Sequence, residues 1–209
     1  MTEGKHSCTP CNAGFWSKEF GPCAPCNAGF FSPEKGASVC TKCPVGRAVK
    51  ATGKAQCEVC KAGKIASKTG LAECSDCPKG WFSATDGQFA CVKCAPGRFT
   101  ASKGKVSCDA CATGRAQKSE GQDVCTPCAD GTFAALQGQR ECGPCAVGEF
   151  RDVSLHKKGD SCHACPKGQY QNKTSNSKYV IGKGKWEWYL LVAYGAGVGS
   201  NFIQLTATG

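Results

Sequence analysis

Large hydrophobic side chains are sparse along the chain and recur at regular intervals between pairs of cysteines. Cys-x-x-Cys pairs begin at Cys8, Cys23, Cys40, Cys57, Cys74, Cys91, Cys108, Cys125, Cys142 and Cys162. Five residues after the second cysteine of a pair, the residue is mostly aromatic, as in Trp16, Phe31, Phe82, Phe99, Phe133, Phe150 and Tyr170. The intervals between pairs are 15 residues, then 17 residues seven times, then 20 residues. Since a fixed period indicates one structural unit used repeatedly, we predict about ten repeats over residues 8–170.

Two glycines recur within the repeat. The first follows the second cysteine of a pair by three residues and the other by ten, as Gly63 and Gly70 follow Cys60. The first allows a positive φ or the close approach of a neighbouring group, and the other lies in runs typical of hairpin turns. We therefore predict a small disulfide-rich fold of mostly β-hairpins and turns with almost no helix. Such small units must stack on their neighbours, which predicts an elongated tandem-repeat rod.

The composition indicates that the fold needs covalent or metallic support. Through residue 178, the large aliphatic residues besides a few valines are Ile65, Leu71, Leu136 and Leu155. So few large side chains cannot offset the conformational entropy of the ordered chain. The chain has 20 cysteines in 209 residues, a fraction typical of disulfide scaffolds.

The charge pattern changes this picture little. The chain has 26 Lys and Arg residues against 16 Asp and Glu residues, a net charge of +10. The basic residues are scattered, and the longest run is Lys157-Lys158. We interpret them as a solvated surface and expect no nucleic-acid partner.

The repeat string, for example CVKCAPGRFTASKGKVSC from Cys91 to Cys108, resembles the cysteine-rich repeats of tumour-necrosis-factor receptors and the related ephrin-receptor-like repeats. Long runs of similar repeats also occur in surface antigens and flagellar-hair proteins. The resemblance implies an extracellular, disulfide-linked structure. It implies the pairs Cys11–Cys23, Cys26–Cys40, Cys43–Cys57, Cys60–Cys74, Cys77–Cys91, Cys94–Cys108, Cys111–Cys125, Cys128–Cys142 and Cys145–Cys162.

The cysteine spacing also permits a different chemistry. Cys-x-x-Cys pairs separated by thirteen residues match zinc-ribbon spacing, and the cysteines would suffice for five Cys₄ sites. Zinc sites would group the pairs two by two, whereas the 17-residue period does not alternate. We therefore predict disulfides and no metal or other cofactor, and an intracellular zinc-binding repeat array stays as an alternative.

Two cysteines have no partner in this scheme. Residues 1–7 are polar, without the apolar stretch of a signal peptide, and TEGKHSC is similar to SKGKVSC, the end of a later repeat. We therefore expect residues 1–7 to be the tail of a truncated repeat and Cys8 to be unpaired or inter-chain. Cys165 opens a last repeat that no later cysteine of the sequence closes, so we expect it also to be unpaired or inter-chain. In one hypothesis, Cys165 of one subunit bonds Cys8 of the next, which would extend the chain head to tail into a filament.

The C-terminal part differs in composition. Residues 171–185 form a linker in our interpretation, and Asn172 begins an N-glycosylation sequon, Asn-Lys-Thr. Residues 186–209 are apolar, with Glu187 as the single charge. We consider three interpretations of this segment: a short membrane anchor, the start of a further β domain, or a strand that docks onto a partner. We favour the β interpretations.

No catalytic constellation is visible, so we predict no enzyme. His6, His156 and His163 are isolated among the repeats, and we find no nucleophile–base order and no phosphate loop. We expect an extracellular or cell-surface structural protein, part of a filament, appendage or surface coat. Its expected partners are further copies of itself or a longer parent chain. The alternative is a receptor or adhesion ectodomain that binds its partner at the irregular repeat from Cys145 to Cys162.

Overall fold

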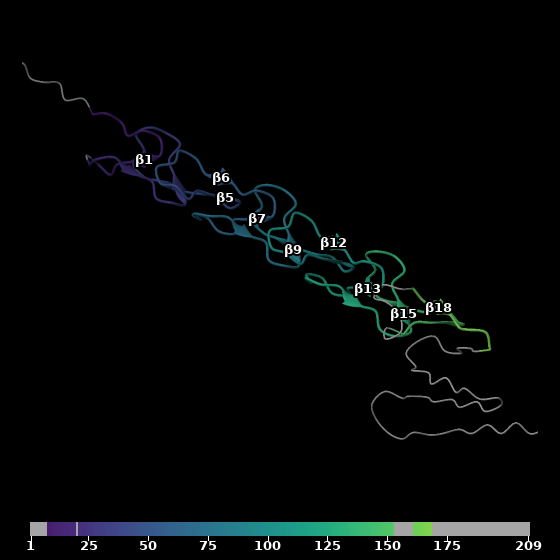
Figure 1. Ribbon diagram of the computed structural model, residues 1–209. Helices are drawn as coiled ribbons and strands as arrows, with labels where there is room; N and C mark the ends of the chain where they lie inside the picture. The colour runs from purple at the N-terminus through teal and green to yellow at the C-terminus, as the bar shows by residue number, and fades with distance from the viewer. Residues whose placement is uncertain (1–7, 20, 153–160, 169–209) are drawn as a thin grey trace, which may run out of the picture. The chain divides into compact units, whose positions relative to one another are not determined.

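The computed structural model describes residues 8–19, 21–152 and 161–168 (Figure 1). These residues form short strands and turns and contain no helix, which confirms the predicted fold class. In chain order the strands are β1 (Phe15–Trp16), β2 (Ala24–Pro25), β3 (Phe30–Phe31), β4 (Thr41–Lys42), β5 (Arg47–Ala48), β6 (Glu58–Val59), β7 (Lys64–Ile65), β8 (Ser75–Asp76), β9 (Trp81–Phe82), β10 (Val92–Lys93), β11 (Arg98–Phe99), β12 (Asp109–Ala110), β13 (Arg115–Ala116), β14 (Thr126–Pro127), β15 (Thr132–Phe133), β16 (Gly143–Pro144), β17 (Glu149–Phe150) and β18 (His163–Ala164).

Each hairpin joins two parts of the repeat pattern. The first strand ends at the mostly aromatic position, and the second consists of the two residues between the cysteines of the next pair. In the antiparallel pair of β7 and β8, Ile65 lies opposite Ser75. The connection turns at Gly70, where φ is 75°. A hairpin with strands this short is not stable alone, so each depends on its disulfide and on neighbouring repeats.

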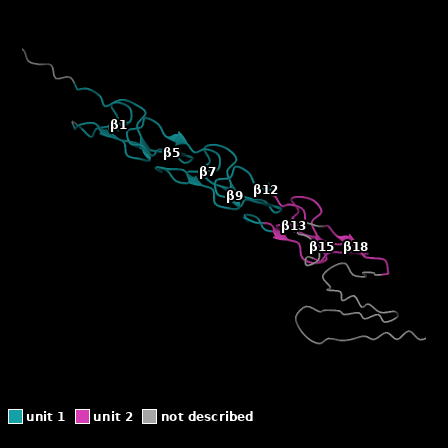
Figure 2. Cartoon of the chain, viewed as in Figure 1, with its two compact units in different colours: residues 1–109, 119–124 teal, residues 110–118, 125–209 magenta. Residues whose placement is uncertain are grey.

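We name each repeat by its opening cysteine, the second of a Cys-x-x-Cys pair, and its loop ends at a closing cysteine, the first of the next pair. The chain splits into two compact units (Figure 2). Unit 1 consists of Met1–Asp109 and Ser119–Val124, and unit 2 consists of Ala110–Lys118 and Cys125–Gly209. Within each unit, hairpins follow one another in chain order (Figure 1).

Backbone hydrogen bonds join each repeat to the next within a unit. In unit 1, the N–H of Gly46 donates to the carbonyl of Ala66 in the following repeat at 2.9 Å. The N–H of Gly87 donates to the carbonyl of Cys60 in the preceding repeat at 2.7 Å. Unit 2 repeats this pattern with bonds from Gly114 to Ala134, from Gly131 to Arg151 and from Gly138 to Cys111.

Cysteines and small side chains occupy the interior, and large apolar side chains lie largely at the surface. The opening cysteines Cys26, Cys43, Cys77, Cys94 and Cys111 are fully buried. By contrast, large hydrophobic side chains such as Leu136 and Val147 are 70% and 73% exposed. Burial of large apolar groups therefore contributes little to this fold, as the composition predicts.

Candidate functional site

Nine disulfides form the framework of the described chain. Their Cα atoms lie 5.6 to 5.8 Å apart, within the usual range for a disulfide. The bonds join Cys11 to Cys23, Cys26 to Cys40, Cys43 to Cys57, Cys60 to Cys74, Cys77 to Cys91, Cys94 to Cys108, Cys111 to Cys125, Cys128 to Cys142 and Cys145 to Cys162. These are the pairs that the family resemblance implies.

Loop length is nearly constant along the framework. The paired cysteines are 14 residues apart in the loops from Cys26 to Cys142, 12 apart at Cys11–Cys23 and 17 apart at Cys145–Cys162. Closing a loop of this length stabilises the folded chain by about 3 kcal/mol in the chain-entropy view. Cys8, which is exposed, and Cys165, which is half-buried, carry free thiols.

The first glycine of a repeat contacts the repeat two positions further on. In unit 1, a Cβ built on Gly63 would overlap the carbonyl oxygen of Gly104, well inside the 3.0 Å that real Cβ atoms keep. Gly63 also has a φ of 85°, a conformation that L side chains rarely adopt. Both reasons that the sequence offers for this glycine therefore apply. The equivalent pairs in unit 1 are Gly14 with Gly53, Gly29 with Gly70, Gly46 with Gly87 and Gly80 with Gly121.

Sequence reasoning missed a second buried slot of the repeat, six residues after the opening cysteine. Ala66, Thr100 and Ala134 occupy it with no exposed surface. The carbonyl of Ala66 accepts the N–H of Gly46 from the preceding repeat, so a small side chain lets two repeats approach. The signal was the recurrence of small side chains there, and the other residues in this slot are Ser17, Ser32, Val49, Ser83, Gln117 and Arg151.

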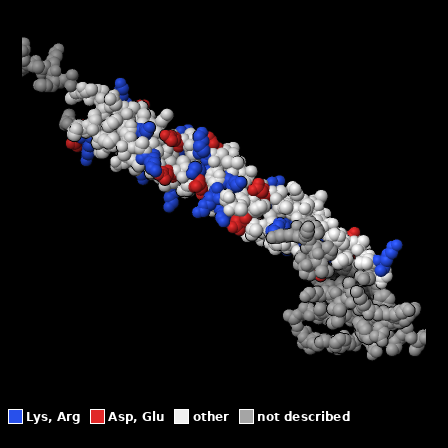
Figure 3. Space-filling model, in the orientation of Figure 1, with Lys and Arg blue, Asp and Glu red and all other residues white. Residues whose placement is uncertain are grey.

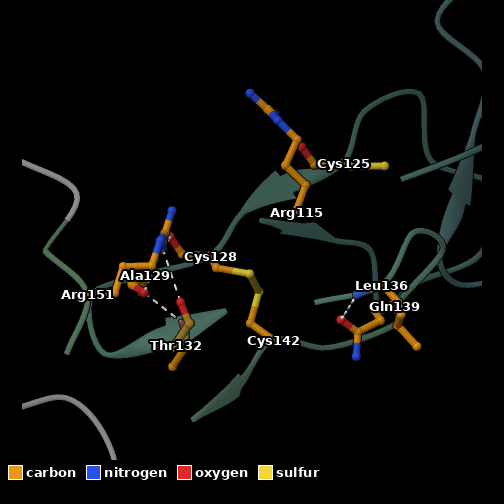
Figure 4. The surroundings of a disulfide bond; sticks show 9 residues. All are labelled: Arg115, Cys125, Cys128, Ala129, Thr132, Leu136, Gln139, Cys142 and Arg151. Atoms are coloured by element: carbon orange, nitrogen blue, oxygen red, sulfur yellow. Dashed lines mark hydrogen bonds between the residues drawn. A yellow bond between two sulfur atoms is a disulfide. The ribbon is translucent and has the colours of Figure 1, made fainter. Parts of the chain in front are cut away.

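The Cys145 repeat places an arginine in this slot. Arg151 is 5% exposed, and its Nη1 donates to the carbonyl oxygens of Cys128 at 3.0 Å, Thr132 at 3.1 Å and Ala129 at 3.3 Å (Figure 4). The guanidinium also lies 5.8 Å from the ring centre of Phe133. Arg151 thus satisfies its buried charge on the backbone of the preceding repeat, within unit 2.

The aromatic residues five positions after an opening cysteine are half-buried wherever the structure describes them. Phe31 packs against the cluster of Cys43, Val49 and Cys57, which includes the disulfide of the following repeat. Here the aromatic ring covers the disulfide of the following repeat.

Exposed ion pairs link neighbouring repeats at a repeated position. Lys50 pairs with Glu73 in unit 1, and Lys118 pairs with Glu141 in unit 2 at the same two repeat positions. The hydrogen bond from Lys50, helped by its charge, holds the pKa of Glu73 below its ordinary value. On the visible face, Lys and Arg are interspersed with Asp and Glu (Figure 3), and exposed ion pairs of this kind contribute little to stability.

The structure also bears on the alternative chemistries. Among residues 8–19, 21–152 and 161–168, no group of three His, Cys, Asp or Glu side chains is placed to hold a metal ion. Eighteen cysteine sulfur atoms are bonded to sulfur, so a Cys₄ zinc array would require those bonds to be absent. His163 lies in β18 opposite Phe150. No helix in the described part of the chain is long and apolar enough to cross a membrane.

Several predicted features lie outside the described residues. They are the tail at 1–7, His6, the irregular run at 153–158 with His156, the sequon at Asn172, the linker at 171–185 and the apolar segment at 186–209. They stay predictions from the sequence.

Small antiparallel hairpins, each closed by one disulfide and connected in tandem, define a disulfide-rich repeat domain. The family model described as tyrosine-protein kinase ephrin type A/B receptor-like matches residues 15–60, 63–111 and 84–124, more than half of the chain. The chain therefore belongs to the ephrin-receptor-like family of cysteine-rich repeats. No curated protein matches the chain. The family and the many disulfides are consistent with an extracellular location.

Proposed function

We propose that the chain is a structural segment of the cell exterior, without enzymatic activity, that serves as a stiff part of a filament, appendage or surface coat. The observation that supports this best is the double linkage of the repeats. Each repeat is closed by its own disulfide, and in unit 1 its first glycine lies against the backbone of the repeat two positions on. Bending or stretching unit 1 must therefore disturb three successive repeats together.

The disulfides also limit how far the chain can extend under load. A reduced 17-residue repeat extends to about 58 Å, at ~3.4 Å per residue. With the disulfide intact, only the residues outside the loop can extend, and the repeat reaches about 16 Å. We expect single-molecule force spectroscopy to show this roughly fourfold difference between oxidised and reduced chains. Equal extensions in both states would contradict the cross-linked design.

Imaging tests the biological role. Native material carrying this chain is expected to appear as ordered filaments or a regular coat by electron microscopy. Treatment with a mild reductant is expected to shorten the persistence length of the filaments, because the hairpins then lose their closure. Incubation in the same buffer without the reductant is the control. Native material consisting of discrete, separate particles would contradict the proposal.

The oxidation state tests the cell-exterior assignment separately. Nine disulfides predict a mass gain of about 18 mass units when the intact chain is fully reduced, at about two per bridge. A metal assay is the companion measurement. Bound zinc with reduced thiols would favour the intracellular zinc array and contradict the proposal.

A receptor or adhesion ectodomain is a second candidate, favoured by the Cys145 repeat. Its loop is longer than the others, with cysteines 17 residues apart in the sequence, and its buried slot holds Arg151. Irregular loops are where repeat proteins commonly carry binding residues. Replacing the loop from Cys145 to Cys162 with the loop from Cys128 to Cys142 tests this role. Loss of saturable binding to intact cells would favour the receptor, and intact filaments without such binding would favour the structural role.

A further inference from the structure

The disulfides differ in how far their closing cysteines are enclosed. The opening cysteine is buried in all nine disulfide-closed repeats. The closing cysteine is buried in three of them, at Cys57, Cys108 and Cys125, which are 4%, 9% and 3% exposed. In the other six repeats it is half-buried or exposed, and Cys74 and Cys91 are half-buried examples. Enclosure of the closing cysteine therefore divides the disulfides into two classes.

The three buried closing cysteines share an arginine four residues after the opening cysteine of their repeat. In each case Nη1 of the arginine donates to the carbonyl oxygen of the closing cysteine, at 2.9 to 3.1 Å. These bonds join Arg47 to Cys57, Arg98 to Cys108 and Arg115 to Cys125. The other six disulfide-closed repeats have no arginine at this position. An arginine can cover neighbouring groups with its stem while its head stays in water, so we assign the enclosure to this side chain.

The Cys60 repeat shows why a lysine does not act in the same way. Lys64 occupies the arginine position and lies opposite Asp76 in the hairpin. Its Nζ donates to Oδ1 of Asp76 at 2.6 Å, so its charge is engaged across the hairpin. Arg47, by contrast, lies opposite Val59, which offers no carboxylate.

The Cys77 repeat has an aromatic side chain in the arginine position. Trp81 lies beneath Lys93, whose Nζ is 5.5 Å from the centre of the indole ring. An indole has a single N–H donor and no planar fork of donors. The closing cysteine of this repeat, Cys91, is half-buried.

We infer that the Cys60 and Cys77 repeats form a redox-sensitive section of unit 1, which small thiols open before they open the Cys43 and Cys94 repeats on either side. All four repeats lie in unit 1. Thiol–disulfide exchange requires the attacking sulfur to reach one sulfur of the disulfide. In the two arginine repeats both cysteines are buried, whereas in the redox-sensitive section only the opening cysteine is buried.

The covalent step is an exchange between two small thiols and one protein disulfide. The thiolate of a low-molecular-weight thiol attacks the sulfur of Cys74, forms a mixed disulfide and expels the Cys60 thiolate, which takes up a proton. A second small thiolate attacks the small-molecule sulfur of the mixed disulfide and expels the Cys74 thiolate, which is also protonated. The protein disulfide is reduced to two thiols, and the two small thiols are oxidised to one disulfide.

The charge of the arginine acts in the opposite direction from its bulk. A guanidinium near a disulfide attracts an incoming thiolate and stabilises the departing one, which would accelerate the exchange. Arg47 and Arg98 are exposed, so water and salt screen this attraction. We therefore expect the enclosure to outweigh the charge, and the order of reduction distinguishes the two effects.

Reduction of the redox-sensitive section would lengthen unit 1 under load without breaking the chain. Each opened loop frees the residues between cysteines that are 14 positions apart, while the loops on either side stay closed. The inference deepens the proposed structural role and rests on it for this mechanical consequence, because it names a redox control of the extension.

The test is the order in which the disulfides of the full 209-residue chain are reduced. Brief exposure of the folded chain to dithiothreitol, followed by alkylation and peptide mass spectrometry, gives a rate for each cysteine. We expect Cys74 and Cys91 to be labelled about tenfold faster than Cys57 and Cys108, or more. Equal rates, or faster labelling of Cys57 and Cys108, would overturn the inference.

Removal of one arginine tests its role in the enclosure. Arg98→Ala is expected to raise the labelling rate of Cys108 about tenfold, towards that of Cys91. Lys103→Ala, which removes an exposed positive charge from the same loop, is the control and is expected to leave the rate of Cys108 unchanged. An unchanged or lower rate in Arg98→Ala would overturn the inference.

Transfer of the arginine to the redox-sensitive section is the converse test. Lys64→Arg combined with Asp76→Ala places an arginine opposite an uncharged side chain, as in the Cys43 repeat. We expect this variant to slow the labelling of Cys74 about tenfold, relative to Asp76→Ala alone. Equal rates in the two variants would overturn the inference.

Imaging separates this inference from the proposed function. Native filaments whose disulfides are all reduced at one rate would overturn the inference and leave the structural role standing. Native material of discrete particles that keeps the expected order of reduction would support the two classes of disulfide and contradict the structural role.

Discussion

The Cys60 repeat of unit 1 and the Cys145 repeat of unit 2 follow one plan but accommodate different residues. The Cys60 loop separates its cysteines by 14 residues and buries Ala66 completely. The Cys145 loop separates its cysteines by 17 residues and buries Arg151 in the same slot. Both keep the disulfide and the two-stranded hairpin. The plan therefore tolerates a longer loop and a large side chain where hydrogen bonds compensate for the change.

The first glycines of these two repeats differ in their surroundings. Gly63 lies against the backbone of Gly104, whereas a Cβ built on Gly148 meets nothing within 4 Å. Their φ angles are nearly equal, at 85° and 83°. The local backbone conformation therefore favours glycine at both positions. At Gly63 the close approach of a neighbouring repeat favours glycine as well.

The largest expected effect is the removal of a disulfide. We expect the double variant Cys60→Ala, Cys74→Ala to lose at least about 3 kcal/mol of unfolding free energy, because the open loop regains its entropy. The variant Cys145→Ala, Cys162→Ala is expected to lose less. The paired cysteines are 14 residues apart in one loop and 17 in the other, so the two loops differ little in closure entropy. A difference between the two losses of unfolding free energy therefore measures how much the flanking repeats stabilise each loop. Urea denaturation measures both losses of unfolding free energy. Equal losses would contradict a role for the contacts with flanking repeats.

Substitution of the first glycine is expected to have the next largest effect. Gly63→Ala is expected to destabilise the chain by about 3 kcal/mol, because the positive φ and the overlap with Gly104 both add strain. Gly148→Ala keeps only the cost of the positive φ, about 1 kcal/mol. Denaturation of the two variants under identical conditions provides the measurement. A cost for Gly148→Ala as large as that for Gly63→Ala would show that neighbouring backbone is unimportant.

Replacement of the buried arginine tests the compensation in the Cys145 repeat. Arg151→Ala is expected to cost about 2 kcal/mol, since it removes the hydrogen bonds to the carbonyl oxygens of Cys128, Thr132 and Ala129. Arg151→Lys keeps the charge but not the planar fork, so we expect an intermediate loss. The unfolding free energy of both variants is compared with that of wild type. Full stability of Arg151→Ala would show that the slot needs no hydrogen-bonding side chain.

The smallest expected effect concerns the exposed ion pair of Lys50 and Glu73. The pKa of Glu73 is lowered in the folded state by its hydrogen bond to Lys50. The pair therefore adds stability above the unfolded pKa, and this stability is lost as the pH falls through the folded pKa, below pH 4.5. Glu73→Gln is expected to reduce the drop in Tm between pH 7 and pH 3 slightly, with a smaller difference at high salt. An unchanged pH profile would show that this pair contributes nothing.

The sequence predicts the repeat because period and residue type both report on local structure. Gly63 needs a positive φ, and the turn at Gly70 needs another, so both leave a visible glycine. The half-buried aromatic at Phe31 was equally visible, because aromatic residues recur at that position of the repeat.

Other features could not be predicted from the same pattern. The sequence shows that small side chains recur at the position of Ala66, but not that they are buried, because their burial depends on the preceding repeat. The contact between Gly63 and Gly104 is also invisible, because the period alone does not show whether a repeat reaches the next repeat or the one beyond. The Arg151 slot contradicts a simple expectation of small residues, and its compensation by backbone carbonyls is a property of the folded state.

The contact between Gly63 and Gly104 has a consequence for biosynthesis. The Cys60 repeat, once it has closed its disulfide at Cys74, still lacks its second support until the chain has been made as far as Gly104, 30 residues later. At ~5–20 residues per second, this delay is on the order of seconds. During translation, the newest two repeats on the growing chain are therefore incompletely supported, and oxidising enzymes have this interval in which to correct a mispaired cysteine.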